Sequence, residues 1–421
     1  MRDGTGLAGD ERRTRVLSCI KCMGFGGAER LLVSAAGARD TEQFDYELAY
    51  VLPSKRALVP EVEAAGVPVH CLGSSESDLD LRWMGRLRQL LMERRFDVVH
   101  FHLPYTAGLG RLVVRSLPRS SRPKTVTTEH NMWTTNPLAL RALNSLTLPL
   151  DAAGLAVSDA VSEAMPPRHR RRVEVVIHGP SRSRLHQRES WRAEVRDELG
   201  VSPDEVLVGT VANLRPGKGY DVFLPAAAAL IDLGLPARFV AVGAGPLEAE
   251  VDDLHRRLGL GDRFLLLGGR SDALRILAGF DVFVLASMSE GFPVSVMEAL
   301  ALGVPMVASA VGAIPDVVTP EVEALLVAPG CQDELVRALT LMIEDAPLRD
   351  RMAAAALIRG AEFDITSAVR RIEAIYQRVA QGTELSLTRQ PPTTVVEAGG
   401  SGPGFDHPSR LAALSGRGEA L

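Results

Sequence analysis

Residues 286–318 read ASMSEGFPVSVMEALALGVPMVASAVGAIPDVV, and they directly follow the apolar run 280–285. The apolar run has the composition of a buried strand. Residues 294–302 have helical spacing, with Pro293 suited to a first helical turn and Gly303 to a terminator. The exposed N–H groups of such a first turn can hold a phosphate, and the helix dipole favours its negative charge. The stretch therefore predicts a strand–loop–helix unit that binds a phosphate-bearing ligand.

Two carboxylates belong to the same unit. Glu290 lies in the loop before the predicted helix, and Glu298 lies inside the helix, eight positions later. A carboxylate accepts hydrogen bonds from sugar hydroxyls. We therefore predict that this unit holds a nucleotide sugar by its diphosphate and its hydroxyls together. The residues between the carboxylates that are predicted to contact this donor are Gly291, Phe292, Pro293 and Val294.

Apolar runs alternate with helix-like segments along the whole chain. We predict strands at 16–20, 46–52, 67–72, 98–102, 125–128, 154–157 and 173–177. After the polar connection 178–190, we predict further strands at 206–211, 237–242, 264–267, 280–285 and 305–309. This alternation is typical of doubly wound parallel sheets, so the fold class is α/β with two Rossmann-like domains in tandem. Such a pair has a cleft between the carboxyl ends of its strands.

The domain boundaries follow from this pattern. We predict a first domain at 14–180, a second domain at 181–361 and a long amphipathic helix at 362–380. Residues 1–13 and 382–421 are rich in small and polar residues, and both are predicted to be disordered.

The composition favours a soluble globular protein and argues against nucleic-acid binding. Of the 421 residues, 46% are hydrophobic and 5% aromatic, and 47 basic side chains stand against 52 acidic ones. A nucleic-acid binder would show a basic excess and stacking aromatics. The four cysteines are interpreted as reduced thiols, although Cys19 and Cys22 have redox-motif spacing. With no apolar signal region and no run of transmembrane length, we predict a cytoplasmic location.

A pair of cations follows the first strand of the predicted second domain. Arg215 and Lys218 lie in the turn NLRPGKGYD, and the chain has only four lysines. A planar guanidinium and a compact ammonium together can neutralise a diphosphate. The alternative is an ordinary basic turn, which the two carboxylates in the same domain make less attractive.

Several glycine-rich turns could approach the ligand closely. Gly243 and Gly245 follow a strand, but the turn lacks the third glycine and the acidic residue of a dinucleotide fingerprint. Arg270 ends another such turn, whose backbone could approach a base. In the first domain, Gly26 and Gly27 open a helix, where a phosphate or sugar could approach its N-terminus. A plain tight turn is the competing interpretation.

Histidines end two of the predicted strands. His130 stands where a strand should deliver side chains to the cleft, and it could orient or polarise the reacting sugar. We expect His100 and His102 to face opposite ways, so that only one of them points inward.

Two further features have competing interpretations. Asp78 and Asp80 have the spacing of a metal-holding pair, but an N-cap of the following helix is the preferred role, and no metal is predicted. The basic stretches 82–95 and 166–172 could touch an anionic membrane from the cytoplasmic side, but solvated faces are the preferred explanation in so arginine-rich a chain.

Taken together, these motifs resemble the GT-B-fold, retaining nucleotide-sugar glycosyltransferases of family 4, also called glycosyl transferases group 1. The resemblance is strongest at 206–318 and covers about 15–380. It implies that Arg215 and Lys218 hold the diphosphate, Glu298 the ribose and Glu290 the transferred sugar. It also implies that Gly26 and Gly27 border the diphosphate and acceptor and that His130 lies near the reacting carbon.

The resemblance further implies that helix 362–380 packs back across the first domain and that no cofactor is needed beyond the donor. The donor would be a nucleoside diphosphate sugar, UDP-linked more commonly than GDP-linked, and the acceptor is left open among glycans, glycolipids and small molecules. The crossover 178–181 reads HGPS, where the family often has Asn-Gly-apolar-Asp. Two alternatives remain: a nucleotide-sugar 2-epimerase and a non-catalytic scaffold that binds a sugar nucleotide.

Overall fold

The computed structural model describes residues 12–73, 75–77 and 80–382, which belong to one compact unit. The predicted disorder at 1–13 and 382–421 falls almost wholly outside these residues, as does the predicted cap Asp78. Among the described residues, no helix combines the length and the apolar character needed to cross a membrane. The cytoplasmic location and the peripheral membrane contact stay predictions.

The first half of the described chain folds around a seven-stranded parallel sheet in the order β3-β2-β1-β4-β5-β6-β7. Its strands are β1 (Thr14–Ile20), β2 (Phe44–Tyr50), β3 (Val69–Cys71), β4 (Val98–His102), β5 (Lys124–Glu129), β6 (Ala153–Ala156) and β7 (Val173–Val175). Its helices are α1 (Gly27–Ala38), α2 (Val59–Ala64), α3 (Arg82–Arg94), α4 (Pro104–Arg115), α5 (Leu138–Thr147), α6 (Asp159–Ala164) and α7 (Pro167–Arg170), with short 3-10 turns η1 (Arg119–Ser121), η2 (Trp133–Thr135) and η3 (Leu148–Leu150).

The second half of the described chain folds around a six-stranded parallel sheet in the order β10-β9-β8-β11-β12-β13. Its strands are β8 (Val206–Val211), β9 (Ala237–Val242), β10 (Phe264–Leu266), β11 (Val282–Leu285), β12 (Met306–Ser309) and β13 (Ala324–Val327). Its helices are α8 (Arg188–Glu198), α9 (Tyr220–Asp232), α10 (Glu248–Arg257), α11 (Ala273–Ala278), α12 (Val294–Leu302), α13 (Ile314–Val317), α14 (Gln332–Glu344) and α15 (Ala346–Gly360), with turns η4 (Arg182–Gln187) and η5 (Gly261–Arg263).

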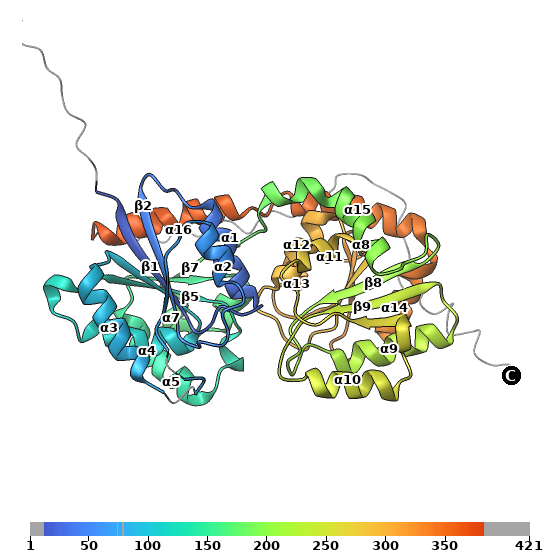
Figure 1. Ribbon diagram of the computed structural model, residues 1–421, viewed down its shortest axis with the longest axis horizontal. Helices are drawn as coiled ribbons and strands as arrows, with labels where there is room; N and C mark the ends of the chain where they lie inside the picture. Colours follow the sequence, from blue (N-terminus) through green and yellow to red (C-terminus); the bar gives the residue numbers. More distant parts are fainter. Residues whose placement is uncertain (1–11, 74, 78–79, 383–421) are drawn as a thin grey trace, which may run out of the picture. The chain divides into compact units, whose positions relative to one another are not determined.

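Helices cover both faces of each sheet, so the strands read as nearly continuous apolar runs. In the first half, α3, α4 and α5 lie on one face and α1, α2 and α16 on the other (Figure 1). Strand β1 lies between β2 and β4, and β8 lies between β9 and β11. The strand order therefore reverses at β1 and at β8, and ligands of such sheets bind at these switch points. The loops that follow β1 and β8 carry the predicted pairs Gly26 with Gly27 and Arg215 with Lys218.

The last helix, α16 (Ile365–Ala380), returns to the first sheet. Its buried face, which includes Ile372, Ile375 and Tyr376, packs in one cluster with Val16 of β1 and Val98 of β4. Asp364 caps this helix by accepting a hydrogen bond from the N–H of Ser367. The helix begins three residues later than predicted, and the domain boundaries at 180 and 361 stay a prediction.

Some sequence-based expectations need correction. Residues 319–361 were assigned no elements, but they form β13, α14 and α15. Pro293 is the N-cap of α12 and precedes its first turn by one position. The predicted aspartate N-cap of α3 is wrong, because Leu81 occupies that position. Asp80, one residue earlier, accepts hydrogen bonds from the backbone and the guanidinium of Arg82.

A buried arginine joins three elements on one face of the first sheet. Arg111 of α4 is fully buried and pairs with Asp151 at 2.8 Å. Its guanidinium also donates to Asn144 at 2.8 Å and Thr147 at 3.1 Å on α5, and to Thr127 at 2.9 Å on β5. Asp151 therefore balances the charge of the buried guanidinium, and the neutral oxygens of the other three residues accept hydrogen bonds from its remaining N–H groups.

Replacing Arg111 by Met should lower the free energy of unfolding by about 3–5 kcal/mol, because Asp151 would stay buried without its partner. Denaturant unfolding measures the change. The matched control is Arg115→Met on the exposed side of the same helix, where we expect a change of about 0.5 kcal/mol or less. Equal losses in both variants would contradict the role given to this network.

Candidate active site

A cleft of about 1050 Å³ lies at the carboxyl ends of both sheets. It is lined by the loops after β1 and β8, by the loop after β5 and by the start of α12. All the residues that the sequence nominated line this one cleft: Gly26, Gly27, His130, Arg215, Lys218, Gly243, Gly245, Arg270, Glu290, Gly291, Phe292, Pro293, Val294 and Glu298. Their individual contacts with a donor stay predictions.

Close backbone contacts fix the loop that carries Glu290. A Cβ built on Gly312 would lie 1.9 Å from the carbonyl oxygen of Glu290, and Gly312 has a φ of 57°. A Cβ built on Gly219 would lie 1.9 Å from the carbonyl oxygen of Ala286, with a φ of 73°. Glycine alone tolerates both the conformation and the approach. The segments 212–219, 286–291 and 311–313 therefore pack as one unit.

Lys218 and Glu290 are joined directly. The Lys218 ammonium donates to Oε1 of Glu290 at 2.6 Å, and the Ser287 hydroxyl donates to the same oxygen at 2.6 Å. Glu290 is buried, with 8% of its side chain exposed, whereas Lys218 is half-buried. An ammonium has three donors, so Lys218 can hold Glu290 and still point a donor into the cleft.

Arg215 faces the cleft from the second half, and Glu29 faces it from the first. Arg215 is exposed, and its charge lowers the pKa of the buried Glu29, although burial raises that pKa more. The Glu29 carboxylate folds back over its own helix start, where a Cβ on Gly26 would lie 2.0 Å from Oε2. Cys22 donates to the same carboxylate at 3.0 Å. Glu29 therefore occupies part of the N-terminus of α1.

The glycine-rich turns of the second half differ in what surrounds them. Gly243 and Gly245 pack against the backbone of 212–214, which gives them a structural role beside their place in the cleft. The Arg270 guanidinium is held by Asp272 at 2.7 Å and Glu198 at 3.1 Å. These carboxylates raise the pKa of Arg270. Its side chain is thus fixed at the rim of the cleft by ion pairs.

His130 is half-buried and belongs to a group of histidines whose other members are buried. Its Nε2 is hydrogen-bonded to Nδ1 of His102 at 3.1 Å, and the rings of His102 and His100 are 4.1 Å apart. His100 is in turn hydrogen-bonded to Thr128 and to the Tyr376 hydroxyl of α16. The expectation that His100 and His102 face opposite ways is wrong, because residues two apart on a strand share a face.

His178, from the atypical crossover, completes the group. It is buried, and it lines a small cavity of about 50 Å³ together with His100, His102 and His130. Burial lowers the pKa of His100 to about 3 and that of His178 to about 4. Burial and the neighbouring imidazoles hold the pKa of His102 and of His130 well below the usual range. All four imidazoles are therefore neutral near pH 7.

Glu129 lies next to this group on β5 with its side chain buried. Burial raises its pKa to about 7, while the charge of Arg111 opposes the shift. Neither carboxylate oxygen has a hydrogen-bond partner within the described part of the chain. Near pH 7 this carboxyl is therefore divided between its neutral and charged forms.

These shifts predict how stability depends on pH. A histidine with a lowered pKa binds its proton more readily in the unfolded chain, so each of the four costs stability as the pH falls below about 6.5. Glu129 acts oppositely, because its raised pKa stabilises the fold as the pH falls from about 7 towards its unfolded value. The histidines outnumber it, so the free energy of unfolding should decrease between about pH 6.5 and 4.5.

Denaturant titrations at several pH values test this expectation. Removing one histidine, as in His178→Asn, should flatten the slope by up to about 1.4 kcal/mol per pH unit. Glu129→Gln should steepen the slope, because the opposing proton is gone. A free energy of unfolding that does not change with pH over this window would contradict the lowered pKa values of the four histidines.

Sequence reasoning missed some residues of the cleft. Lys21, Lys55 and Lys218 all line it, so three of the chain's four lysines meet there. Glu29 and His178 were also not nominated. The scarcity of lysine in an arginine-rich chain was a usable signal for Lys21 and Lys55, whereas the burial of Glu29 and His178 has no sequence signature. Among the described residues, no group of three or more His, Cys, Asp or Glu side chains is arranged to hold a metal ion.

Comparison with known proteins agrees with this geometry. Residues 25–208 match the family model described as Glycosyltransferase Family 4, and residues 192–359 match the model described as Glycosyl transferases group 1. A putative glycosyltransferase EpsF of Bacillus subtilis is 26% identical over 74% of this chain and 81% of its own length. A UDP-Gal:alpha-D-GlcNAc-diphosphoundecaprenol alpha-1,3-galactosyltransferase of Escherichia coli is 25% identical over 83% of this chain and 93% of its own.

The fold is also similar to that of solved proteins. HepE of Anabaena, solved in complex with UDP and glucose, has a TM-score of 0.76 and 22% identity over 87% of this chain and all of its own. A sucrose-phosphate synthase of Thermosynechococcus elongatus has a TM-score of 0.71 and 17% identity over 88% of this chain and all of its own. The predicted GT-B arrangement of two Rossmann-like sheets is therefore confirmed.

Proposed function

This chain belongs to the group 1, family 4 glycosyltransferases with a nucleotide-sugar donor, and we propose that it transfers a hexose-type sugar from UDP to an acceptor bound by its first half, with retention at the anomeric carbon. The observation that carries the proposal is the single cleft in which Arg215, Lys218, Glu290 and the start of α12 meet His130. Cations, a helix N-terminus and carboxylates are the groups that a sugar diphosphate requires.

The chemistry is stabilisation of a leaving group. The bond between the anomeric carbon and the β-phosphate oxygen breaks, and its electron pair goes to the departing nucleoside diphosphate. Arg215, Lys218 and the N–H groups at the start of α12 stabilise the negative charge that develops on that oxygen. The acceptor hydroxyl attacks from the same face, and its proton passes to the leaving phosphate, so the configuration is retained.

The carboxylates and the histidine position the sugar. Glu290 would accept hydrogen bonds from the transferred sugar and Glu298 from the ribose. A neutral His130 can both donate to and accept from a sugar hydroxyl without adding charge near the reacting carbon. The proposal requires no metal and no cofactor beyond the donor.

The relatives support a UDP-linked donor, since one is solved with UDP and another is named for UDP-galactose. The acceptor of the Escherichia coli relative is named as a sugar linked to diphosphoundecaprenol. For this chain we keep the acceptor class open among glycans, glycolipids and small molecules.

Incubating the protein with a panel of UDP- and GDP-sugars, with calorimetry for binding and detection of released diphosphate for turnover, tests the proposal. Arg215→Ala and Lys218→Ala should each lower turnover by about a hundredfold or more, because charge on the leaving group would lose a preorganised partner. The matched control is Arg256→Ala, an exposed arginine of α10. Near-normal turnover in both cleft variants would refute the assignment.

The same assay separates the alternatives. Incubation of the preferred donor alone would yield an epimer if the protein were a 2-epimerase. Donor binding without any turnover, in the presence of candidate glycan, glycolipid and small-molecule acceptors, would identify a scaffold.

His102 gives an independent test of how His130 is held. His102→Phe fills the space but removes the hydrogen bond to His130, so kcat should fall about ten- to hundredfold. The donor KM should stay within about twofold, since His102 lies behind His130. An unchanged circular dichroism spectrum would show that the fold is intact. A change in KM alone would show that His102 does not act through His130.

A further inference from the structure

Helix α5 and the following turn η3 carry large apolar side chains on their outer side. Leu138 is 77% exposed, Leu146 is 79% exposed and Leu150 is 43% exposed, and Ala142 between them is also exposed. Positions 138, 142 and 146 are four apart, so they follow one face of the helix. We call these four residues the α5 strip. The opposite face of the helix is buried through Asn144 and Thr147, which bond to Arg111.

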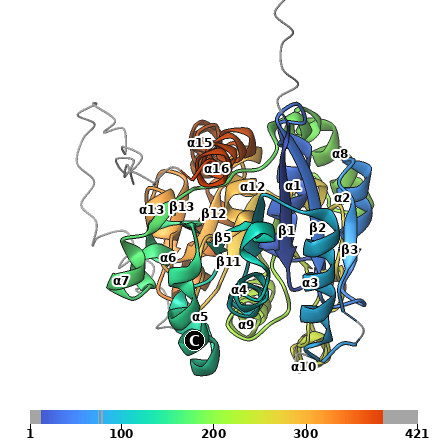
Figure 2. The same ribbon diagram turned by 90° about the vertical axis from the view of Figure 1, so that its left-hand side faces the viewer.

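The segments next to the α5 strip carry mainly basic side chains, although α6 also has the exposed Asp159 and Glu163. Residues 131–150 contain a single charged side chain, Arg141, and no acidic one. Residues 164–172 contain Arg168, Arg170, Arg171 and Arg172 and no acidic residue. Arg172 donates to the carbonyl oxygens of Pro149 and Asp151 at 3.5 Å, which places this basic segment against the end of the strip. Figure 2 shows α5, α6 and α7 on the same side of the first half.

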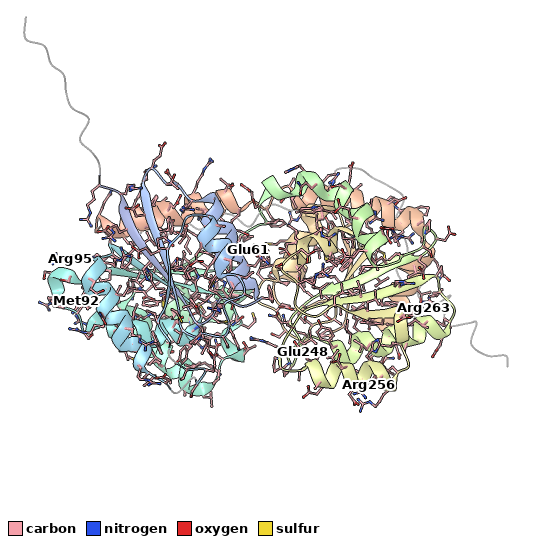
Figure 3. All side chains as sticks on the ribbon, viewed as in Figure 1. Glu61, Met92, Arg95, Glu248, Arg256 and Arg263 are labelled. Carbon is pink, nitrogen blue, oxygen red and sulfur yellow. The ribbon has the colours of Figure 1, made fainter. Side chains whose placement is uncertain are left out.

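Helix α3, which also had membrane-binding composition, lacks a comparable face. Trp83, Leu87 and Leu91 are buried in the core beneath it. Met92 is 37% exposed, and it lies with Arg95 at the outer end of the helix (Figure 3). Its apolar side is therefore already used in folding, whereas that of α5 is not.

We propose that the α5 strip and the basic segment 166–172 dock together on an anionic lipid bilayer. The leucines would enter the boundary between headgroups and acyl chains, and the arginines would contact lipid phosphates. An apolar strip flanked by a segment with four arginines fits such a surface, because the arginines attract lipid phosphates while the leucines bury apolar area. The strip begins eight residues after His130, so docking brings the cleft close to the membrane.

Co-sedimentation of the full-length protein with vesicles tests the proposal. Phosphatidylcholine vesicles containing about a third phosphatidylglycerol should bind the protein, and pure phosphatidylcholine vesicles should bind it about tenfold less. Leu138→Ser combined with Leu146→Ser should weaken binding to the anionic vesicles about tenfold or more, because buried apolar area drives the insertion. The matched control is Leu233→Ser combined with Ile358→Ser. These two aliphatic side chains lie outside the α5 strip and are 66% and 74% exposed.

The charge contribution has its own pair of variants. Arg168→Glu with Arg171→Glu should weaken binding to anionic vesicles, whereas Arg256→Glu with Arg257→Glu on α10 should not. Arg256 is labelled on α10 in Figure 3. No binding to anionic vesicles, or equal loss in strip and control variants, would overturn the proposal. Dimerisation that the strip variants abolish, measured by sedimentation velocity without lipid, would assign the strip to a second copy instead.

The measurement uses lipid binding alone, so it is independent of the donor assignment. A protein that binds vesicles but turns over no nucleotide sugar would leave this inference standing and remove the proposed function. A protein that turns over a nucleotide sugar but binds no anionic vesicles would leave the proposed function standing and remove this inference.

Discussion

The approach of two helix N-termini constrains the whole site. Gly27 begins α1 and Val294 begins α12, and a Cβ built on Gly27 would lie 3.3 Å from Cγ2 of Val294. Both helices follow loops at the carboxyl edge of a parallel sheet, where partial positive charge gathers. Their meeting gives the cleft a positive end before any side chain is considered. Arg215 and Lys218 add to that potential, and Glu29 and Glu290 offset it locally.

Polar side chains buried beneath the cleft hold His130 in place through hydrogen bonds and ring contacts. Tyr376, His100, His102 and His130 form a connected series of hydrogen bonds and ring contacts from α16 to the cleft. Burial of neutral imidazoles costs less than burial of charges, which is why their pKa values are lowered. The same low polarity leaves Glu129 partly neutral. The proposed diphosphate site thus has neutral imidazoles behind it, whereas the cations Arg215 and Lys218 line the cleft itself.

Much of this was visible in the sequence. The bounds of β8, β9 and α12 agree with the expected ranges, because apolar strand runs and a clear Pro/Gly frame mark them. The nominated residues that line the cleft could be picked out because their spacing belongs to strand–loop–helix units. The segment 319–361 was missed because it carries none of the ligand-binding motifs, although Asp345 and Pro347 mark the start of α15 and Gly360 marks its end. Pairings such as Lys218 with Glu290, or His178 with His102, join positions far apart in the chain, so no local pattern could give them.

The chain crosses between the two sheets twice, and the two crossings touch. A Cβ on Gly179 would lie 2.4 Å from the carbonyl carbon of Phe363, so the segment before η4 and the segment before α16 pack backbone against backbone. His178 precedes the first crossing and belongs to the histidine group, and α16 follows the second and supplies Tyr376 to the same group. Both crossings are therefore connected directly to the histidine group that includes His130. The crossover 178–181, which departs from the family pattern, therefore supplies two contacts at once. His178 joins the histidine group, and Gly179 packs against the segment that precedes α16.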